Sequence, residues 1–161
     1  MSAMGTYIYA SPMGSLAIEH DGEGVVALRF TEELPLPGGC PQVLADTVRW
    51  LDAYFGGEVP GATPAQRLHG TEFQRRVWTV LKDIPYGETI TYGELARRVG
   101  CRSAQAVGQA VGRNPIAIII PCHRVVEAGG HLGGYAHGVD RKRRLLGLEK
   151  QYINQLKINQ Q

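Results

Sequence analysis

A cysteine, a histidine and an arginine follow one another at Cys122-His123-Arg124, within the largely apolar run Ile116–Val126. The apolar flanks indicate a buried backbone, and Pro121 stiffens the chain directly before the cysteine. An ordinary thiol is only slightly ionised at neutral pH, but a nearby base converts it into a soft nucleophile. A buried cysteine alone is most often just a small apolar side chain. The adjacent histidine and arginine are costly to bury without partners, so we favour nucleophilic chemistry.

Two short helices are predicted upstream of this run. Thr91 and Ser103 are N-cap residues for helices over 92–99 and 104–112, and Gly100 ends the first. A helix, a short turn and a second helix form the layout of a DNA-reading helix-turn-helix. The second helix consists mainly of alanine and glycine, although each glycine costs about 1 kcal/mol of helix propensity. The face of this helix that lacks bulky side chains either packs closely in a core or enters a DNA groove.

A final helix is predicted after the Gly133-Gly134 pair, where the backbone can pass close to a ligand. Asp140 is its expected cap, and Arg141–Arg144 supplies four consecutive cations. Cations at a helix start oppose the helix dipole, which suggests phosphate contact, with a solvated surface as the alternative. Glu149 lies near the end of this helix, and the polar tail 151–161 is expected to fray.

The N-terminal part is predicted to be a small α+β domain over 1–57. Three strand-like segments within 6–30 are separated by turn residues and predict an antiparallel meander. A helix follows Pro41 and ends at Gly56-Gly57. No catalytic constellation occurs here, so we expect a supporting role. Residues 58–70 form a connector, and the capping-box pair Thr71 and Gln74 opens a mostly helical domain over 71–150.

Composition narrows the class of protein. At 161 residues the chain suits one domain or two small ones. Residues 1–70 carry eight acidic and three basic residues, whereas residues 71–161 carry seven acidic and fourteen basic residues. A polyanion partner for the second half is one explanation, and an ordinary solvated surface is the other. Three cysteines without a CxxC motif fit a reducing cytoplasm and predict no structural metal site. No signal or membrane-spanning segment is evident.

The active-site run resembles a specific signature. Asn114-Pro115 followed by Ile120–Val125 is similar to that of the O6-alkylguanine-DNA alkyltransferases, also called methylated-DNA–protein-cysteine methyltransferases. The similarity extends over about Thr71–Glu149 and includes Pro85–Thr89, Thr91–Leu95, Ala106-Val107-Gly108 and Gly133-Gly134-Tyr135. The resemblance implies an α+β protein, with a ribonuclease-H-like N-terminal sheet and helix and a winged-helix-like C-terminal domain.

The resemblance also implies roles for individual residues. Cys122 attacks the alkyl carbon of O6-alkylguanine in a flipped-out nucleotide and keeps the alkyl group, so each molecule acts once. His123 takes the thiol proton through a water, and Glu149 holds the imidazole. Asn114 shapes the turn, and Tyr92 assists nucleotide rotation. The expected DNA and substrate contacts are Tyr92, Gly93, Arg102, Ser103, Gln105, Ala106, Gly108, Arg124, Gly133, Gly134, Tyr135 and Lys142.

The implied partner is double-stranded DNA that contains O6-alkylguanine, with O4-alkylthymine as a further candidate substrate. We expect a cytoplasmic monomer that needs no cofactor, no metal and no membrane. One position departs from the family pattern: family members usually carry an arginine that fills the space of the flipped base, and Gln105 stands there in this chain. We therefore expect weaker DNA affinity or slower repair, which Arg102 could offset.

Three other functions fit the sequence less well. A non-catalytic alkyltransferase-like protein typically has tryptophan in place of the nucleophile, whereas this chain has Cys122. A winged-helix transcription factor leaves the Pro-Cys-His-Arg run and Glu149 unexplained. A cysteine hydrolase requires direct pairing of the thiol with a base, but neighbouring side chains on extended backbone point in opposite directions.

Overall fold

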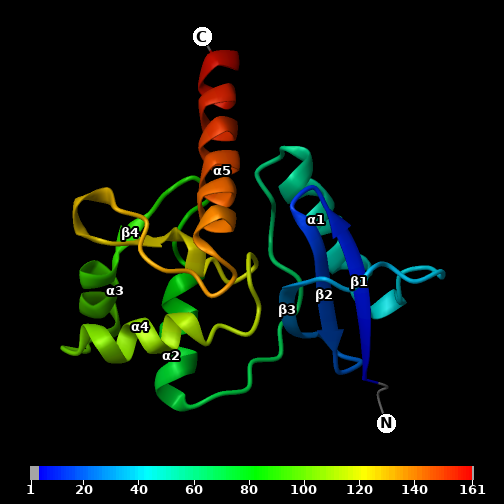
Figure 1. The fold of residues 1–161 in the computed structure, drawn as a ribbon, viewed down its shortest axis with the longest axis horizontal. Helices are drawn as coiled ribbons and strands as arrows, with labels where there is room; N and C mark the ends of the chain where they lie inside the picture. Colours follow the sequence, from blue (N-terminus) through cyan, green and yellow to red (C-terminus); the bar gives the residue numbers. More distant parts are fainter. Residues whose placement is uncertain (1–3, 161) are drawn as a thin grey trace. The chain divides into compact units, whose positions relative to one another are not determined.

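The computed structural model describes residues 4–160, which form two compact units (Figure 1). One unit comprises Met1–His69 together with Pro115–Ala117, and the other comprises Gly70–Asn114 and Ile118–Gln161. The first combines a small antiparallel sheet with a helix, and the second is mostly helical. The predicted α+β class is therefore confirmed.

The first unit is built on three antiparallel strands in the order β1 (Gly5–Ser11), β2 (Gly14–His20) and β3 (Val25–Thr31). This is the predicted meander. Ile18 pairs with Leu28 across the two strands β2 and β3, and both side chains are buried. Leu16, Ala17 and Ile18 follow one another on β2 and are all buried, so side chains on both faces of this central strand are packed.

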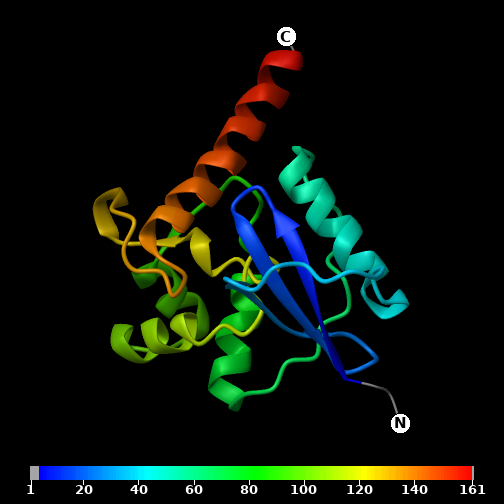
Figure 2. The same ribbon diagram turned by 45° about the vertical axis from the view of Figure 1, so that its right-hand side comes forward.

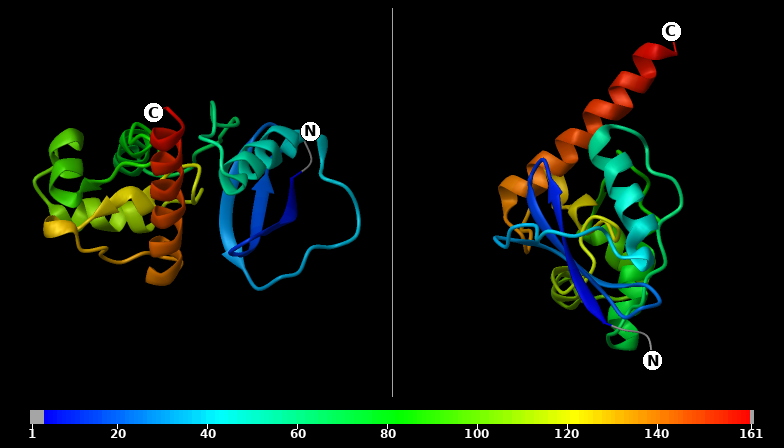
Figure 3. Two further views of the ribbon diagram at one scale, coloured as in Figure 1. Left: turned by 90° about the horizontal axis from the view of Figure 1, so that it is seen from above. Right: turned by 90° about the vertical axis from the view of Figure 1, so that its right-hand side faces the viewer.

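A helix lies along one face of this sheet (Figures 2 and 3). After Pro41 the chain makes a short 3-10 turn, η1 (Gln42–Leu44), and continues as α1 (Ala45–Gly56). Gly57 ends the helix in the left-handed conformation, at φ 93°. The Tyr9 hydroxyl donates a hydrogen bond of 2.6 Å to Asp52 Oδ1, which ties β1 to α1.

The open edge of β3 is covered by two short segments that run parallel to it. Val25 bridges Gln66, and Leu28 bridges Ile116. The Leu28 N–H donates to the Pro115 carbonyl at 2.9 Å, and the Ala117 N–H donates to the Leu28 carbonyl at 3.0 Å. The chain therefore contributes a backbone pairing to the first unit only a few residues before Cys122, which the sequence analysis did not predict.

The second unit contains four α-helices: α2 (Glu72–Leu81), α3 (Tyr92–Val99), α4 (Ala104–Gly112) and α5 (Val139–Asn159). A two-residue parallel pairing joins β4 (Ile90–Thr91) to β5 (Val125–Val126). Trp78 of α2 is buried, and its indole N–H donates to the Ala110 carbonyl of α4 at 2.9 Å. The apolar core includes Val77, Trp78, Leu81, Ile84, Leu95, Val107, Val111, Ile118, Ile120 and Leu145.

The helix starts follow the predicted caps. Thr71 and Gln74 exchange both hydrogen bonds of a capping box. The Thr91 hydroxyl accepts from the Glu94 N–H, while the Glu94 carboxylate binds Arg97 and Arg98. The Ser103 hydroxyl caps α4 by accepting from the Ala106 N–H. Helix α3 ends at Val99 and α4 begins at Ala104, so only four residues separate the two helices.

Helix α5 differs from the prediction at both ends. Gly138 occupies the N-cap position, while Asp140 lies inside the first turn and pairs with Arg143. The helix also continues to Asn159, although the sequence analysis predicted a fraying tail from residue 151. Tyr152 packs edge-on against Tyr86 and Ile153 covers Gly87, so contacts hold the helix as far as residue 153, and the residues after it are exposed.

Gly87 is required at this contact, because a Cβ there would lie only 2.4 Å from Ile153 Cγ1 and its φ is +82°.

No helix in the described part of the chain has the length and apolar character needed to cross a membrane.

Candidate active site

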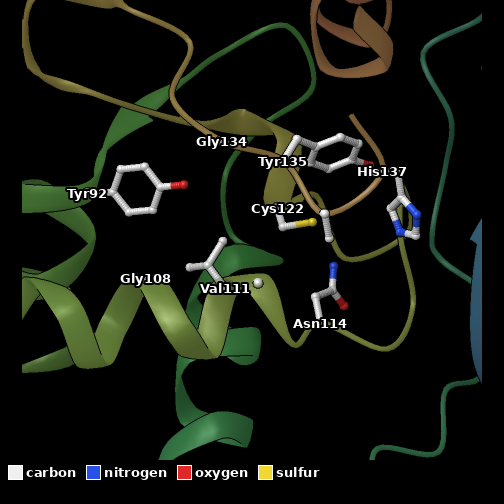
Figure 4. A pocket seen from close by; sticks show the side chains of 10 residues that line it. Tyr92, Gly108, Val111, Asn114, Cys122, Gly134, Tyr135 and His137 are labelled. Atoms are coloured by element: carbon white, nitrogen blue, oxygen red, sulfur yellow. The ribbon is translucent and has the colours of Figure 1, made fainter. Parts of the chain in front are cut away.

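Cys122 lies at the base of a pocket within the second unit (Figure 4). The cysteine begins a 3-10 turn, η2 (Cys122–Arg124), and is 6% exposed. The cavity has a volume of about 190 Å³. Its walls come from the start of α3, the end of α4 and the loop before α5: Tyr92, Gly108, Val111, Gly112, Asn114, Gly134, Tyr135, Ala136 and His137.

The turn before Cys122 is held in a strained conformation. Ile118 has φ 70°, which is rare for a β-branched residue, and its side chain is buried. The Asn114 side-chain amide donates to the Ile120 carbonyl at 2.7 Å and so closes the turn over six residues. The Cys122 N–H donates to the same carbonyl at 2.8 Å. Asn114 thus shapes this turn, as expected from the resemblance.

The surroundings of the Cys122 thiol disfavour its ionisation. Burial raises the pKa of Cys122, while a hydrogen bond from Asn114 and the positive charge of Lys142 act in the opposite direction. Burial wins because the thiolate has little access to water. A base is therefore needed to generate the nucleophile.

His123 follows Cys122 directly in the chain and is the imidazole whose surroundings bear on this question. Its backbone belongs to the 3-10 turn rather than to the extended segment that the sequence analysis assumed. The fully buried ring directs Nε2 toward Glu149 Oε2 of α5, at 2.5 Å. Nδ1 is also buried and makes no hydrogen bond within the described residues. Since a carboxylate only accepts, Nε2 carries the hydrogen and the lone pair lies on Nδ1.

Glu149 accepts hydrogen bonds from two parts of the unit, the backbone at Gly87 and the turn that holds His123 and Arg124. Oε1 accepts from the Gly87 N–H at 2.9 Å and from Arg124 Nε at 2.8 Å. Oε2 accepts from Arg124 Nη2 at 3.2 Å as well as from His123. A buried carboxylate with several strong donors is held in its ionised form.

The protonation states of this pair follow from its surroundings. Burial opposes ionisation of Glu149, but hydrogen bonds and charge from His123 and Arg124 lower its pKa to about 2. Burial also lowers the pKa of His123, with help from the charges of Arg124 and Lys142, although Glu149 acts to raise it. At neutral pH the pair therefore consists of a neutral imidazole and a carboxylate.

Two predicted DNA contacts are buried instead. Arg124 is 6% exposed, and its guanidinium binds Glu149 and donates from Nη1 to the Ile84 carbonyl at 2.8 Å. Lys142 is 0% exposed, and its ammonium donates to the Val125 carbonyl at 2.7 Å and the Gly134 carbonyl at 3.1 Å. Both predictions are corrected, because each cation is buried and hydrogen-bonded to groups within the protein.

Lys142 instead contributes to the pocket. Its bond to Gly134 fixes the loop that forms one wall, and its ammonium lies 5.9 Å from the centre of the Tyr92 ring. Burial lowers the pKa of Lys142, which the charges of Cys122 and Glu127 partly offset. Of the four cations Arg141–Arg144 at the start of α5, Lys142 is therefore buried inside the unit.

The remaining predicted residues lie on the surface or on the pocket wall. Gly93, Arg102, Ser103 and Gln105 are exposed around the starts of α3 and α4, and Ala106 and Gly108 are half-buried on α4. Tyr92, Gly108, Gly134 and Tyr135 line the pocket itself. Gly133 is half-buried with φ +73°, and a Cβ there would meet Glu127 Cγ at 3.1 Å.

His137 is a pocket residue that the sequence analysis missed. Its ring lies edge-on to Tyr135, with ring centres 5.4 Å apart, and it borders the cavity near Asn114 (Figure 4). Burial lowers its pKa, with a further contribution from Arg141. Only its closeness in sequence to the Gly133-Gly134-Tyr135 segment could have indicated this position.

Acid should destabilise the folded protein in two steps. The lowered pKa of His123 means that the folded state resists protonation, so stability falls as the pH drops below the ordinary histidine range near about 6.5. The stabilisation from Glu149 is complete above the ordinary pKa range of a glutamate, about 4.3, and is lost as the pH falls toward about 2. Urea unfolding from pH 8 to pH 3 measures both steps, and Glu149→Gln should remove the second. Equal unfolding free energies at pH 7.5 and pH 5 would contradict the first.

Comparisons with known proteins agree with this geometry. The sequence model described as "6-O-methylguanine DNA methyltransferase, DNA binding domain" matches residues 72–151. The methylated-DNA–protein-cysteine methyltransferase of Mycobacterium tuberculosis is 47% identical over 146 residues, covering 87% of this chain and 88% of that protein. The protein of the same name from Methanosarcina acetivorans is 44% identical over 149 residues, covering 88% and 96%.

Solved structures show the same relationship. The crystal structure of M. tuberculosis O6-methylguanine methyltransferase has a TM-score of 0.83 and 44% identity, covering 93% of this chain and 94% of that chain. A crystal structure of M. tuberculosis OGT in complex with DNA has a TM-score of 0.81 and 45% identity, covering 90% and 92%. Identity at this level over most of both chains shows that this chain belongs to the methylated-DNA–protein-cysteine methyltransferase family.

Proposed function

We propose that this protein repairs alkylated DNA directly, by moving the alkyl group from O6 of guanine to Cys122. The observation that carries the proposal is a buried thiol at the base of a small pocket, next to a neutral imidazole that a carboxylate holds in place. Relatives of similar length are named for this activity. O4-alkylthymine also carries an alkyl carbon on the exocyclic oxygen of a base, and it is a further candidate substrate.

The transfer requires one proton movement and one displacement. The Cys122 proton passes through a water to His123 Nδ1, whose lone pair is free because Nε2–H is bonded to Glu149. The sulfur then forms a bond to the alkyl carbon as the bond from that carbon to O6 breaks. The electron pair of the broken bond stays on the guanine, which takes up one proton. The thioether has no ready leaving group, so each chain acts once.

The target base must leave the DNA stack to reach a buried sulfur, at a cost of about a few kcal/mol. We assign the DNA-reading role to α4, whose exposed start bears Gln105 and whose Gly108 borders the pocket. Tyr92 at the start of α3 lies on the same pocket and is placed to guide the nucleotide. Exposed Arg102 and Ser103 precede α4 and suit contact with the DNA backbone. We further propose that the protein acts as a cytoplasmic monomer without a cofactor.

Mass spectrometry tests the proposal. After incubation with a duplex that contains O6-methylguanine, the intact protein should gain the mass of one CH₂ per chain, and peptide mapping should place the gain on Cys122. Cys122→Ser should show no gain, whereas Cys40→Ser and Cys101→Ser should react normally, because these thiols lie outside the pocket. Tight binding of the lesion without any gain in mass would instead identify a non-catalytic damage-binding protein.

Gln105→Arg should accelerate repair. Gln105 is exposed near the start of α4, where it can enter the stack but adds no charge to attract the phosphates. An arginine there should fill the same space and strengthen DNA binding. The single-turnover rate at limiting DNA concentration measures the effect. Gln109→Arg, which adds the same charge at another exposed position on α4, serves as the control. A rate for Gln105→Arg no higher than that of the unmodified protein would contradict the expectation.

A further inference from the structure

The guanidinium of Arg124 is buried and hydrogen-bonded to groups inside the second unit. Nε and Nη2 bind the two oxygens of Glu149, at 2.8 and 3.2 Å, and Nη1 binds the Ile84 carbonyl at 2.8 Å. Its carbon atom Cζ also lies 5.6 Å from the centre of the Tyr86 ring. An arginine binds a carboxylate most strongly through two hydrogen bonds of this kind. Arg124 therefore acts on Glu149 and, through it, on His123.

The charges that face the buried His123 ring come from few sources. Its own turn supplies Arg124, and α5 supplies Glu149 and Lys142. The titratable thiol of Cys122 precedes His123 in the same turn and is neutral when protonated. The segment before β4 supplies the neutral Tyr86, whose ring stacks on the guanidinium. The ammonium of Lys142 is bonded to carbonyl groups and makes no hydrogen bond to Glu149 in the described residues. Arg124 is thus the cation that directly neutralises the carboxylate.

A buried histidine and glutamate without this cation would behave differently. An uncompensated carboxylate is expensive to bury, so the isolated pair would bind a proton and become neutral overall. With Arg124 in place the carboxylate is already neutralised, and no proton is needed. A pair that already holds a proton cannot accept one from a thiol.

We propose that Arg124 is a positioning residue that keeps the His123–Glu149 pair free of a bound proton, and that it thereby sets the lower pH limit of alkyl transfer. The proposal rests on the function proposed above and adds a control of its pH range. The direction of the charge effects supports it, since the Arg124 charge favours the neutral form of His123 and the ionised form of Glu149.

The pH dependence of the single-turnover rate tests this role in three variants. Arg124→Met removes the charge, Arg124→Lys keeps it, and Lys150→Met removes an exposed cation next to Glu149 in sequence. We expect the acidic limb of the Arg124→Met profile to move upward by at least one pH unit, equivalent to about a tenfold loss at a fixed acidic pH. Its rate should recover at alkaline pH. Arg124→Lys should shift less, and Lys150→Met should follow the unmodified protein.

Other roles for Arg124 give different results. A purely structural role would lower the rate equally at every pH, and a DNA-contact role would weaken DNA binding and change its salt dependence without moving the profile. Either result would overturn the proposal, as would a shift in Arg124→Lys as large as that in Arg124→Met.

A second measurement does not depend on alkyl transfer, and its first part needs no variant. The ¹⁵N imidazole signals of His123 in the unmodified DNA-free protein should remain those of a neutral ring at and below pH 6.5, the ordinary midpoint for histidine. In Arg124→Met the imidazolium signals should appear at a pH at least one unit higher. Protonation of His123 in the unmodified protein at or above the ordinary midpoint would overturn the proposal. If no alkyl transfer occurs at any pH, the proposed function fails, while this titration still decides the role of Arg124.

Discussion

The buried carboxylate of Glu149 joins three parts of the second unit that are far apart in sequence. It accepts hydrogen bonds from Gly87 before β4, from His123 and Arg124 in the turn at the nucleophile, and it is itself carried by α5. Removing any one donor would leave a buried ion with an unmet bond, which is strongly destabilising. The same carboxylate fixes the tautomer of His123, so folding and chemistry depend on one interaction.

Around this carboxylate the structure holds a buried thiol in a small pocket. Burial disfavours ionisation of the Cys122 thiol, while Asn114 and Lys142 supply a hydrogen bond and a positive charge that favour the thiolate. The strained turn at Ile118 and the Lys142 bonds to the loop at Gly134 hold the pocket walls in place. A rigid site of this kind positions reacting atoms without reorganisation during the reaction.

The sequence predicted features that follow from local rules. The meander of β1–β3, the caps at Thr71 and Ser103 and the helices α3 and α4 each arise from nearby residues, and the structure contains them. The buried surroundings of Cys122 also followed from the apolar run. Partners distant in sequence were harder to infer. The pairing of Glu149 with His123 was predicted only from the family resemblance, because a glutamate near a helix end has many possible partners.

The incorrect predictions have a common physical origin. Arg124 and Lys142 were assigned to DNA because cations are usually exposed, yet both are buried with hydrogen-bonded partners supplied by the tertiary fold. The polar segment after residue 150 was expected to fray, but Tyr152 and Ile153 have contacts at Tyr86 and Gly87 that stabilise the helix. In each case a contact between distant segments overrode a local tendency.

The single-turnover rate of methyl transfer in His123→Gln, at saturating lesion-containing DNA, tests the central claim most directly. If the imidazole is the base that activates Cys122, the rate should fall by about 10²–10⁴-fold while the affinity for DNA stays unchanged. A rate within a few-fold of the unmodified protein would show that the thiol does not depend on His123 and would contradict this account.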